Sequence, residues 1–185
     1  MKLKFLSIMI VLAVIGSAAY AVDVNGTIAQ GEYARETSFD NGNFRLLWKI
    51  QGDAIFMAID AKAAGWVAIG FEPTNIMANA DMIFGIVDKS GRLQSIDARS
   101  TGMFGPHPPD LNQGGQDSIL AAAAGRSQDR VVFEFSRKLN TSDKLDNVIP
   151  AKGSIKIIWA YSSGLQFTAN HSKAGKATLV MDGSE

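Results

Sequence analysis

Apolar and polar residues alternate with a period of two along most of the chain. Between residues 44 and 50, the apolar side chains of Phe44, Leu46, Trp48 and Ile50 are separated by Arg45, Leu47 and Lys49. The same alternation continues from residue 55 to 60, after the turn Gln51-Gly52-Asp53. Alternation on both sides of a short turn predicts a β-hairpin.

Further strands are predicted downstream of this hairpin. Two short apolar runs at 65–71 and 82–87 predict buried strands, and residues 92–99 follow the second run as its hairpin partner. The pattern also predicts strands at 131–136, 155–161 and 177–181. The alanine-rich segment 118–125 has helical propensity, but its shortness and the strands around it favour a strand. About nine short strands separated by turns are typical of an antiparallel sandwich or barrel.

The first 21 residues have the layout of a signal peptide. Lys2 and Lys4 precede an almost uninterrupted apolar run at 5–15, which is shorter than the roughly 20 apolar residues that span a bilayer. Ala19-Tyr20-Ala21 has the small residues at which a signal peptidase cleaves. We therefore expect cleavage near Ala21, a single domain at residues 22–185, and a periplasmic or secreted location. The alternative is an uncleaved membrane anchor.

Composition excludes several classes of chemistry. The chain has 18 basic and 18 acidic residues and no basic block, so nucleic acid is not an expected partner. It has no cysteine, which rules out disulfides, thiolate zinc sites, iron–sulfur clusters and covalently attached haem. It has two histidines, His107 and His171, so any chemistry that needs imidazole has two candidates. Motifs of serine hydrolases, zinc proteases and phosphate-binding loops are absent, which disfavours hydrolysis.

Several segments in a characteristic order resemble a known family. They are Gly65-Trp66-Val67-Ala68-Ile69-Gly70-Phe71, Met77-Ala78-Asn79-Ala80-Asp81-Met82, Phe133-Glu134-Phe135-Ser136-Arg137-Lys138-Leu139, and Trp159-Ala160-Tyr161 before Phe167 and His171. Together, across about residues 42–175, they resemble the DOMON family, which includes modules of dopamine β-monooxygenase and the cytochrome domain of cellobiose dehydrogenase. The resemblance implies an all-β fold, namely an antiparallel, immunoglobulin-like β-sandwich in a single domain.

The haem-binding branch of this family implies a ligand pair. Its members hold a b-type haem without covalent bonds, through a methionine in the loop after the G-W-x-A-I-G-F strand and a histidine after the W-A-Y strand. The matching residues here are Met77 and His171. By their closeness in sequence to these two, Phe71 and Phe167 are expected near the haem. His107, in a proline-rich loop, is the reserve ligand.

The chemistry of this pair favours electron transfer. A thioether favours ferrous iron and raises the reduction potential, and two protein ligands leave no axial position for dioxygen or substrate. We therefore expect an exported b-type cytochrome that is not itself an enzyme. Because no dehydrogenase or membrane domain is fused to it, its partner would be a separate redox protein, such as a membrane cytochrome or a periplasmic oxidoreductase.

Two alternatives remain. One is a module that binds a sugar or another small ligand without haem, using the irregular loop 100–116 and aromatic residues in it such as Phe104. The other is a haem-carrying subunit of a periplasmic oxidoreductase complex. Asp81 and Asp110 are expected to hold loops through hydrogen bonds to the backbone. A calcium role for such aspartates stays open, although no dense carboxylate cluster argues for it.

Overall fold

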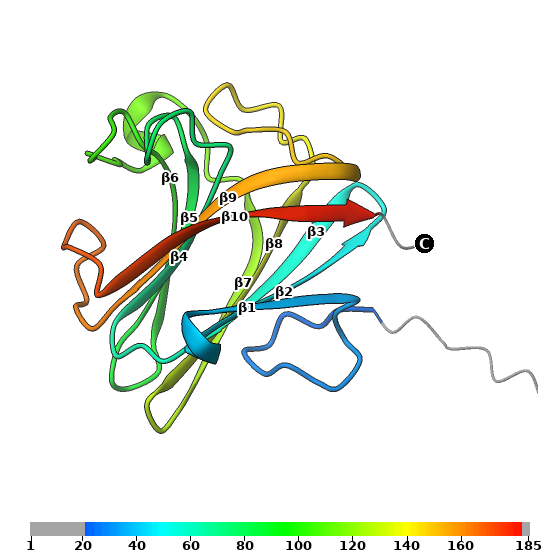
Figure 1. The fold of residues 1–185 in the computed structure, drawn as a ribbon, viewed down its shortest axis with the longest axis vertical. Helices are drawn as coiled ribbons and strands as arrows, with labels where there is room; N and C mark the ends of the chain where they lie inside the picture. The colour runs from blue at the N-terminus through cyan, green and yellow to red at the C-terminus, as the bar shows by residue number, and fades with distance from the viewer. Residues whose placement is uncertain (1–20, 183–185) are drawn as a thin grey trace, which may run out of the picture.

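The protein folds as two antiparallel β-sheets packed face to face (Figure 1). The computed structural model describes residues 21–182. Its ten strands are β1 (Arg35–Phe39), β2 (Phe44–Gln51), β3 (Ala54–Ala61), β4 (Trp66–Phe71), β5 (Asp81–Val87), β6 (Leu93–Arg99), β7 (Ile119–Ser127), β8 (Arg130–Lys138), β9 (Lys152–Ser162) and β10 (Lys173–Asp182). Two short 3-10 turns, η1 (Asp40–Gly42) and η2 (Asp110–Gln113), complete the elements. The first sheet has the order β1-β2-β3-β8-β7, and the second has the order β10-β9-β4-β5-β6.

This architecture confirms the predicted all-β, antiparallel sandwich in a single domain. The hairpin β2–β3 pairs Ile50 with Ile55, and the alanine-rich segment forms strand β7, as the pattern predicted. One strand was missed. β1 has the sequence RETSF, with too few apolar residues for the alternation to reveal it.

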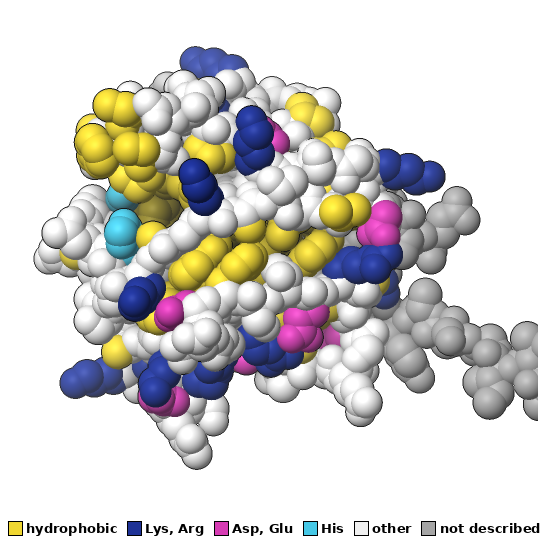
Figure 2. All heavy atoms as spheres, viewed as in Figure 1, with side chains coloured by type: hydrophobic (Ala, Val, Ile, Leu, Met, Phe, Trp, Pro, Cys, Tyr) yellow, Lys and Arg dark blue, Asp and Glu magenta, His cyan; other side chains and the backbone are white. Residues whose placement is uncertain are grey.

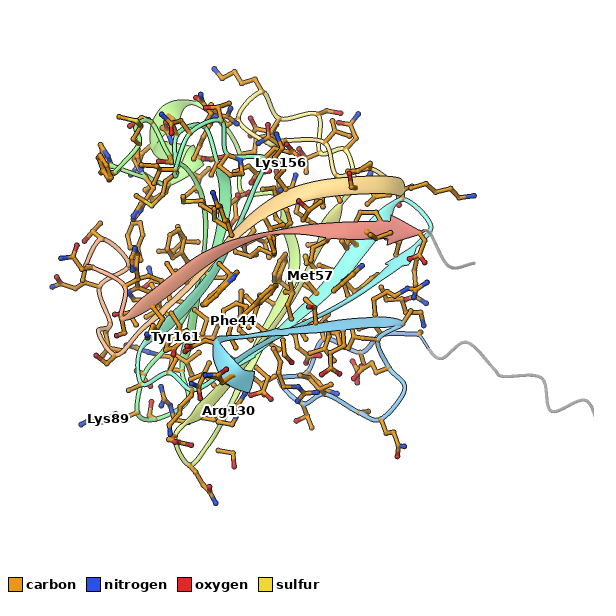
Figure 3. The ribbon with its side chains drawn as sticks, viewed as in Figure 1. Phe44, Met57, Lys89, Arg130, Lys156 and Tyr161 are labelled. Carbon is orange, nitrogen blue, oxygen red and sulfur yellow. The ribbon has the colours of Figure 1, made fainter. Side chains whose placement is uncertain are left out.

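The core lies between the two sheets and follows from the alternation. Inward-facing residues of β2 and β3, such as Phe44 and Met57, are fully buried and meet the inward faces of β4, β5 and β9 (Figure 3). The fit is close at Gly85 of β5, because an added Cβ would lie 2.4 Å from the ring of Phe133. Atoms of protein interiors do not approach so closely. Gly85 therefore sets how near the two sheets come.

The N-terminal segment 22–34 packs on the outer face of the first sheet. Glu134 of β8, fully buried, accepts hydrogen bonds from the backbone N–H groups of Asn25, Gly26 and Thr27 at 3.1, 2.7 and 3.1 Å. Its other carboxylate oxygen accepts the hydroxyl of Tyr33 at 2.7 Å. The segment is thereby fixed to the sheet through one carboxylate.

Residues 1–20 lie outside the described part of the chain, so the signal peptide stays a prediction. Within residues 21–182, no helix is long and apolar enough to cross a bilayer.

Candidate functional site

The outer face of the second sheet is apolar, which is unusual for a sandwich. Strands of antiparallel sheets commonly alternate between apolar residues facing the core and polar residues facing water. Every residue of β4 and β5 is buried instead. Their outward side chains form a second apolar cluster, separate from the core, which we call the outer cluster. Its buried members are Trp66, Ala68, Ala80, Met82, Phe84, Ile86, Ile96 and Ala98.

Three loops cover the outer cluster: 72–80 between β4 and β5, 100–109 after β6, and 163–172 between β9 and β10. Met77 from the first loop and Phe167 from the third pack against the cluster. The first two loops are joined to each other, because the backbone N–H of Met77 donates to the carbonyl of Met103 at 3.3 Å. Met77 and both histidines therefore come from loops around one apolar surface.

Phe84 is the centre of the aromatic contacts in this site. Its ring centroid lies 5.6 Å from that of Trp66, 5.5 Å from that of Phe167 and 5.1 Å from that of His107. His107 also contacts Phe167, at 5.6 Å between centroids. Such separations are those of favourable aromatic pairs. The rings of Phe167 and His107 thus lie over the apolar surface of the sheet.

The surroundings of His107 favour its neutral form. Burial lowers the pKa of His107 below its ordinary value, because an apolar environment disfavours the charged imidazolium. Its Nδ1 atom is buried and has no hydrogen-bond partner. A neutral imidazole with a free nitrogen has the form in which histidine binds metals.

The other predicted site residues occupy different positions. His171 is exposed in the third loop, and both of its neighbours are hydrogen-bonded to the end of β9. The carbonyl of Asn170 accepts the hydroxyl of Ser162 at 3.1 Å, and the backbone N–H of Ser172 donates to the carbonyl of Tyr161. Phe71 is fully buried in the core between the sheets, because it points to the inner face of β4. The structure therefore places Met77, Phe167 and His107 at the outer cluster, His171 at its covering loop, and Phe71 on the opposite face of the sheet.

Exposed apolar side chains gather around the same loops. Ile76, Met103, Phe104 and Leu165 are between 43% and 78% exposed. Figure 2 shows hydrophobic side chains collected at the upper left of the view, with histidine beside a recess there. Apolar groups concentrated on one exposed region mark an interaction site more often than scattered ones do.

A second candidate site is a hollow with polar and apolar lining on the outer face of the first sheet. It has a volume of about 660 Å³ and is lined by the segment 26–31 together with Tyr33, Glu36, Arg45, Asp60 and Arg126. Three of its charged groups are already paired, since Arg45 contacts Glu36 at 2.9 Å and Asp60 at 3.0 Å. This size is that of a small-molecule site.

Sequence reasoning missed a group of buried carboxylates. Asp81, Asp97 and Asp146 come together although they are far apart in the chain. The expectation that no carboxylate cluster exists is therefore wrong. So is the role expected for Asp110, because both of its side-chain oxygens are buried without a hydrogen-bond partner.

The fold and the outer cluster define the class of this protein as a β-sandwich with an apolar site outside its core. Comparison with known proteins identifies its family. The profile of the DOMON domain matches residues 40–162. The chain belongs to the DOMON family. It is 31% identical over 156 residues to DBH-like monooxygenase protein 1 of Homo sapiens, covering 82% of this chain and 23% of that protein. It is also 31% identical over 121 residues to MOXD1 homolog 2 of Drosophila melanogaster, covering 65% and 15%.

These relatives are much longer than the chain, which spans less than a quarter of their lengths. Among solved structures, the cytochrome domain of Myriococcum thermophilum cellobiose dehydrogenase has a similar fold. The TM-score is 0.55 with 11% identity, and the match covers 80% of this chain and 82% of that domain. The likeness confirms the fold.

Proposed function

We propose that this protein is an exported b-type cytochrome that binds one non-covalent haem over the outer cluster, with Met77 and His171 as axial ligands. The observation that carries the proposal is the apolar outer face of β4 and β5 beneath loops that bear Met77 and both histidines. A porphyrin needs an apolar surface of this kind, and a thioether with an imidazole is a known axial pair. The family member with a similar fold is named a cytochrome domain.

The chain's own residues would perform distinct tasks in this site. Trp66 and Phe84 provide an apolar floor, and burial there removes water from around the bound group. Met77 and His171, on the first and third covering loops, would hold the cofactor from outside the sheet. When bound, haem supplies an iron that cycles between the ferrous and ferric states. The function is electron transfer to a separate redox protein, without catalysis by this chain.

Haem binding would require His107 and Phe167 to move. Both rings now contact Phe84 and lie over the floor of the site. His107 is also the competing ligand, because its Nδ1 is unpartnered and its imidazole is neutral. Family resemblance favours His171, whereas burial favours His107. Single variants of the two histidines decide between them.

The test is an absorption spectrum of the purified protein after expression with adequate haem or reconstitution with hemin. The expected result is a Soret band with sharp reduced α and β bands, which indicates six-coordinate low-spin iron. Met77→Ala should lose the low-spin spectrum and lower the potential, while the matched control Met103→Ala, in the neighbouring loop, should keep both. A colourless protein that hemin does not reconstitute would refute the cytochrome proposal.

The histidine ligand is identified by the same spectra. His171→Ala should reduce haem retention more than Met77→Ala does, and His107→Ala should leave the low-spin spectrum unchanged. The reverse pattern would assign the ligand to His107 and remove His171. Unchanged spectra in the variants of Met77 and of both histidines would mean that the ligands lie elsewhere.

A second candidate function is the binding of a sugar or similar polar molecule without haem. The hollow on the first sheet favours it, because its volume and its polar side chains suit such a ligand. In this case a panel of sugars should raise the melting temperature of the haem-free protein. Arg45→Met should abolish that shift, whereas Met77→Ala should not change it.

A further inference from the structure

Three carboxylates converge at the upper end of the sandwich (Figure 1), where β5, β6 and the loop between β8 and β9 meet. Asp81 begins β5, Asp97 lies in β6 and Asp146 lies in the loop. One side-chain oxygen from each lies within 4.8 Å of the others. Two oxygens bound to one calcium ion at 2.3–2.6 Å can be at most about 5 Å apart. The spacing therefore suits a single ion.

The hydrogen bonds of these carboxylates are incomplete. Asp81 and Asp97 are 1% and 4% exposed, and the side chain of Asp146 is 2% exposed. Each of the first two uses Oδ2 to accept a backbone N–H, from Asn147 and from Ser118, both at 2.8 Å. The Oδ1 atoms of Asp81 and Asp97 and both oxygens of Asp146 are buried without a hydrogen-bond partner. Buried polar groups are normally satisfied, so these four atoms indicate a missing partner.

When all three carboxylates are ionised, the charges of the cluster do not balance without a cation. Arg137, fully buried, contacts Asp81 at 2.7 Å and Asp146 at 3.5 Å. Three carboxylates with one guanidinium leave two negative charges uncompensated in a buried site, which is strongly unfavourable. A divalent cation would balance them. Asp110, 1% exposed and also unpartnered, adds a further carboxylate to the region.

We propose that Asp81, Asp97 and Asp146 bind a divalent cation of the calcium type. Carboxylate oxygens are the ligands that such hard cations prefer, and a flexible coordination shell suits a site built from two strands and a loop. The site is structural: it joins β5 and β6 to the loop that follows β8. It also contacts the loop of Met77 through Asn147, the residue after Asp146, whose side-chain amide donates to the carbonyl of Asn79 at 3.4 Å.

The alternative is that protons, not a cation, neutralise the cluster. Burial raises the pKa of Asp97 to about 8 and, with repulsion from neighbouring carboxylates, raises the pKa of Asp110 to about 7. Protonated carboxyl groups could then share hydrogen bonds. Calcium and protons would compete for the same oxygens, so the two explanations give opposite results in the presence of the ion.

The test uses chelator-treated protein without haem, titrated with calcium chloride by calorimetry at pH 8, with melting temperatures measured in parallel. We expect one ion per chain, in or below the roughly millimolar range in which extracellular calcium modules bind. At a hundredfold excess over Kd, the melting temperature should rise by roughly 5–11 °C for a chain of this size. Asp97→Asn and Asp146→Asn should each weaken binding at least tenfold.

The matched control is Asp129→Asn in the turn between β7 and β8. Its carboxylate is 61% exposed and lies at the opposite end of β7 from Ser118, the residue that donates to Asp97. It should bind calcium as the unmodified protein does. No binding heat and no shift of the melting temperature would overturn the proposal, and so would equal binding by the Asp97 variant. Asn variants that are more stable than the unmodified protein and indifferent to calcium would establish the proton-sharing explanation. Neither result depends on whether haem binds.

Discussion

The N-terminal segment 22–34 should detach from the first sheet when Glu134 is replaced by alanine. The carboxylate accepts three backbone N–H groups and one hydroxyl, from Tyr33. Hydrogen bonds to a charged acceptor contribute about 1.5–3 kcal/mol each, so the four set an upper limit of roughly 6–12 kcal/mol. The loss is smaller in practice, because donors freed by detachment regain hydrogen bonds with water.

We expect Glu134→Ala to lower the free energy of unfolding by about 3 kcal/mol, which corresponds to a fall of roughly 6–12 °C in melting temperature. Glu134→Gln is the matched control. Its amide oxygen can still face the three N–H groups while its NH₂ donates to the Tyr33 hydroxyl, so the loss should be about 1 kcal/mol.

Hydrogen exchange localises the effect. In Glu134→Ala the amides of Asn25, Gly26 and Thr27 should exchange at rates near those of an unstructured chain, while amides of β4 and β5 stay protected. The hollow should be lost with the segment, because residues 26–31 form one of its walls. A variant whose stability lies within about 0.5 kcal/mol of the unmodified protein, the usual scatter of surface substitutions, would show that Glu134 does not fix the segment. Unchanged exchange of these amides would show the same.

Three further predictions concern the other features. Burial raises the pKa of Asp97 to about 8 and that of Asp110 to about 7 in the folded protein, whereas the unfolded chain releases these protons at lower pH. With calcium removed by a chelator, the free energy of unfolding should therefore fall as pH rises from about 4 to 8. The fall should be on the order of 1 kcal/mol per pH unit for each group. Urea midpoints across this range measure it, and a flat profile would contradict it. Gly85→Ala should cost about 2–3 kcal/mol, since the new Cβ would meet the ring of Phe133; unaltered chemical denaturation would disprove the close fit. Phe84→Ala should cost about 3 kcal/mol and release haem, as thermal melts and absorbance would reveal, and full haem retention would argue against the outer cluster as its site.

The sandwich was accessible from sequence because most strands have one buried face. Alternation gave β2, β3, β8 and β9 directly, and glycines inside the apolar run before Phe71 distinguished a strand from a helix. β1 escaped because it is an edge strand with a polar sequence, paired with β2, in which the one apolar residue, Phe39, packs against the core.

The site was harder to predict, because sequence proximity does not specify the face of a sheet. Phe71 is six residues from Met77 yet points into the core, whereas Phe84 from the next strand lies at the outer cluster. A period-two count from Trp66 would have separated the faces, since Trp66, Ala68 and Gly70 point outward. The aspartates gave no local signal. Each lies 16 or more positions from the next along the chain, and only the pairing of β5 with β6 brings the first two together.

Both ends of the described chain lie near one another on the first two strands. The backbone N–H of Val22 donates to the side chain of Gln51 at 3.2 Å, and Asp182 accepts a hydrogen bond from Arg35 at 3.0 Å. Figure 1 shows this side at the right, with the three covering loops of the outer cluster at the left and top. A linker to an electrode, a dye or a fusion partner attached at residue 22 or 182 would therefore leave the covering loops facing outward. Immobilised protein could then be presented in one orientation, with its proposed electron-exchange surface accessible from solution.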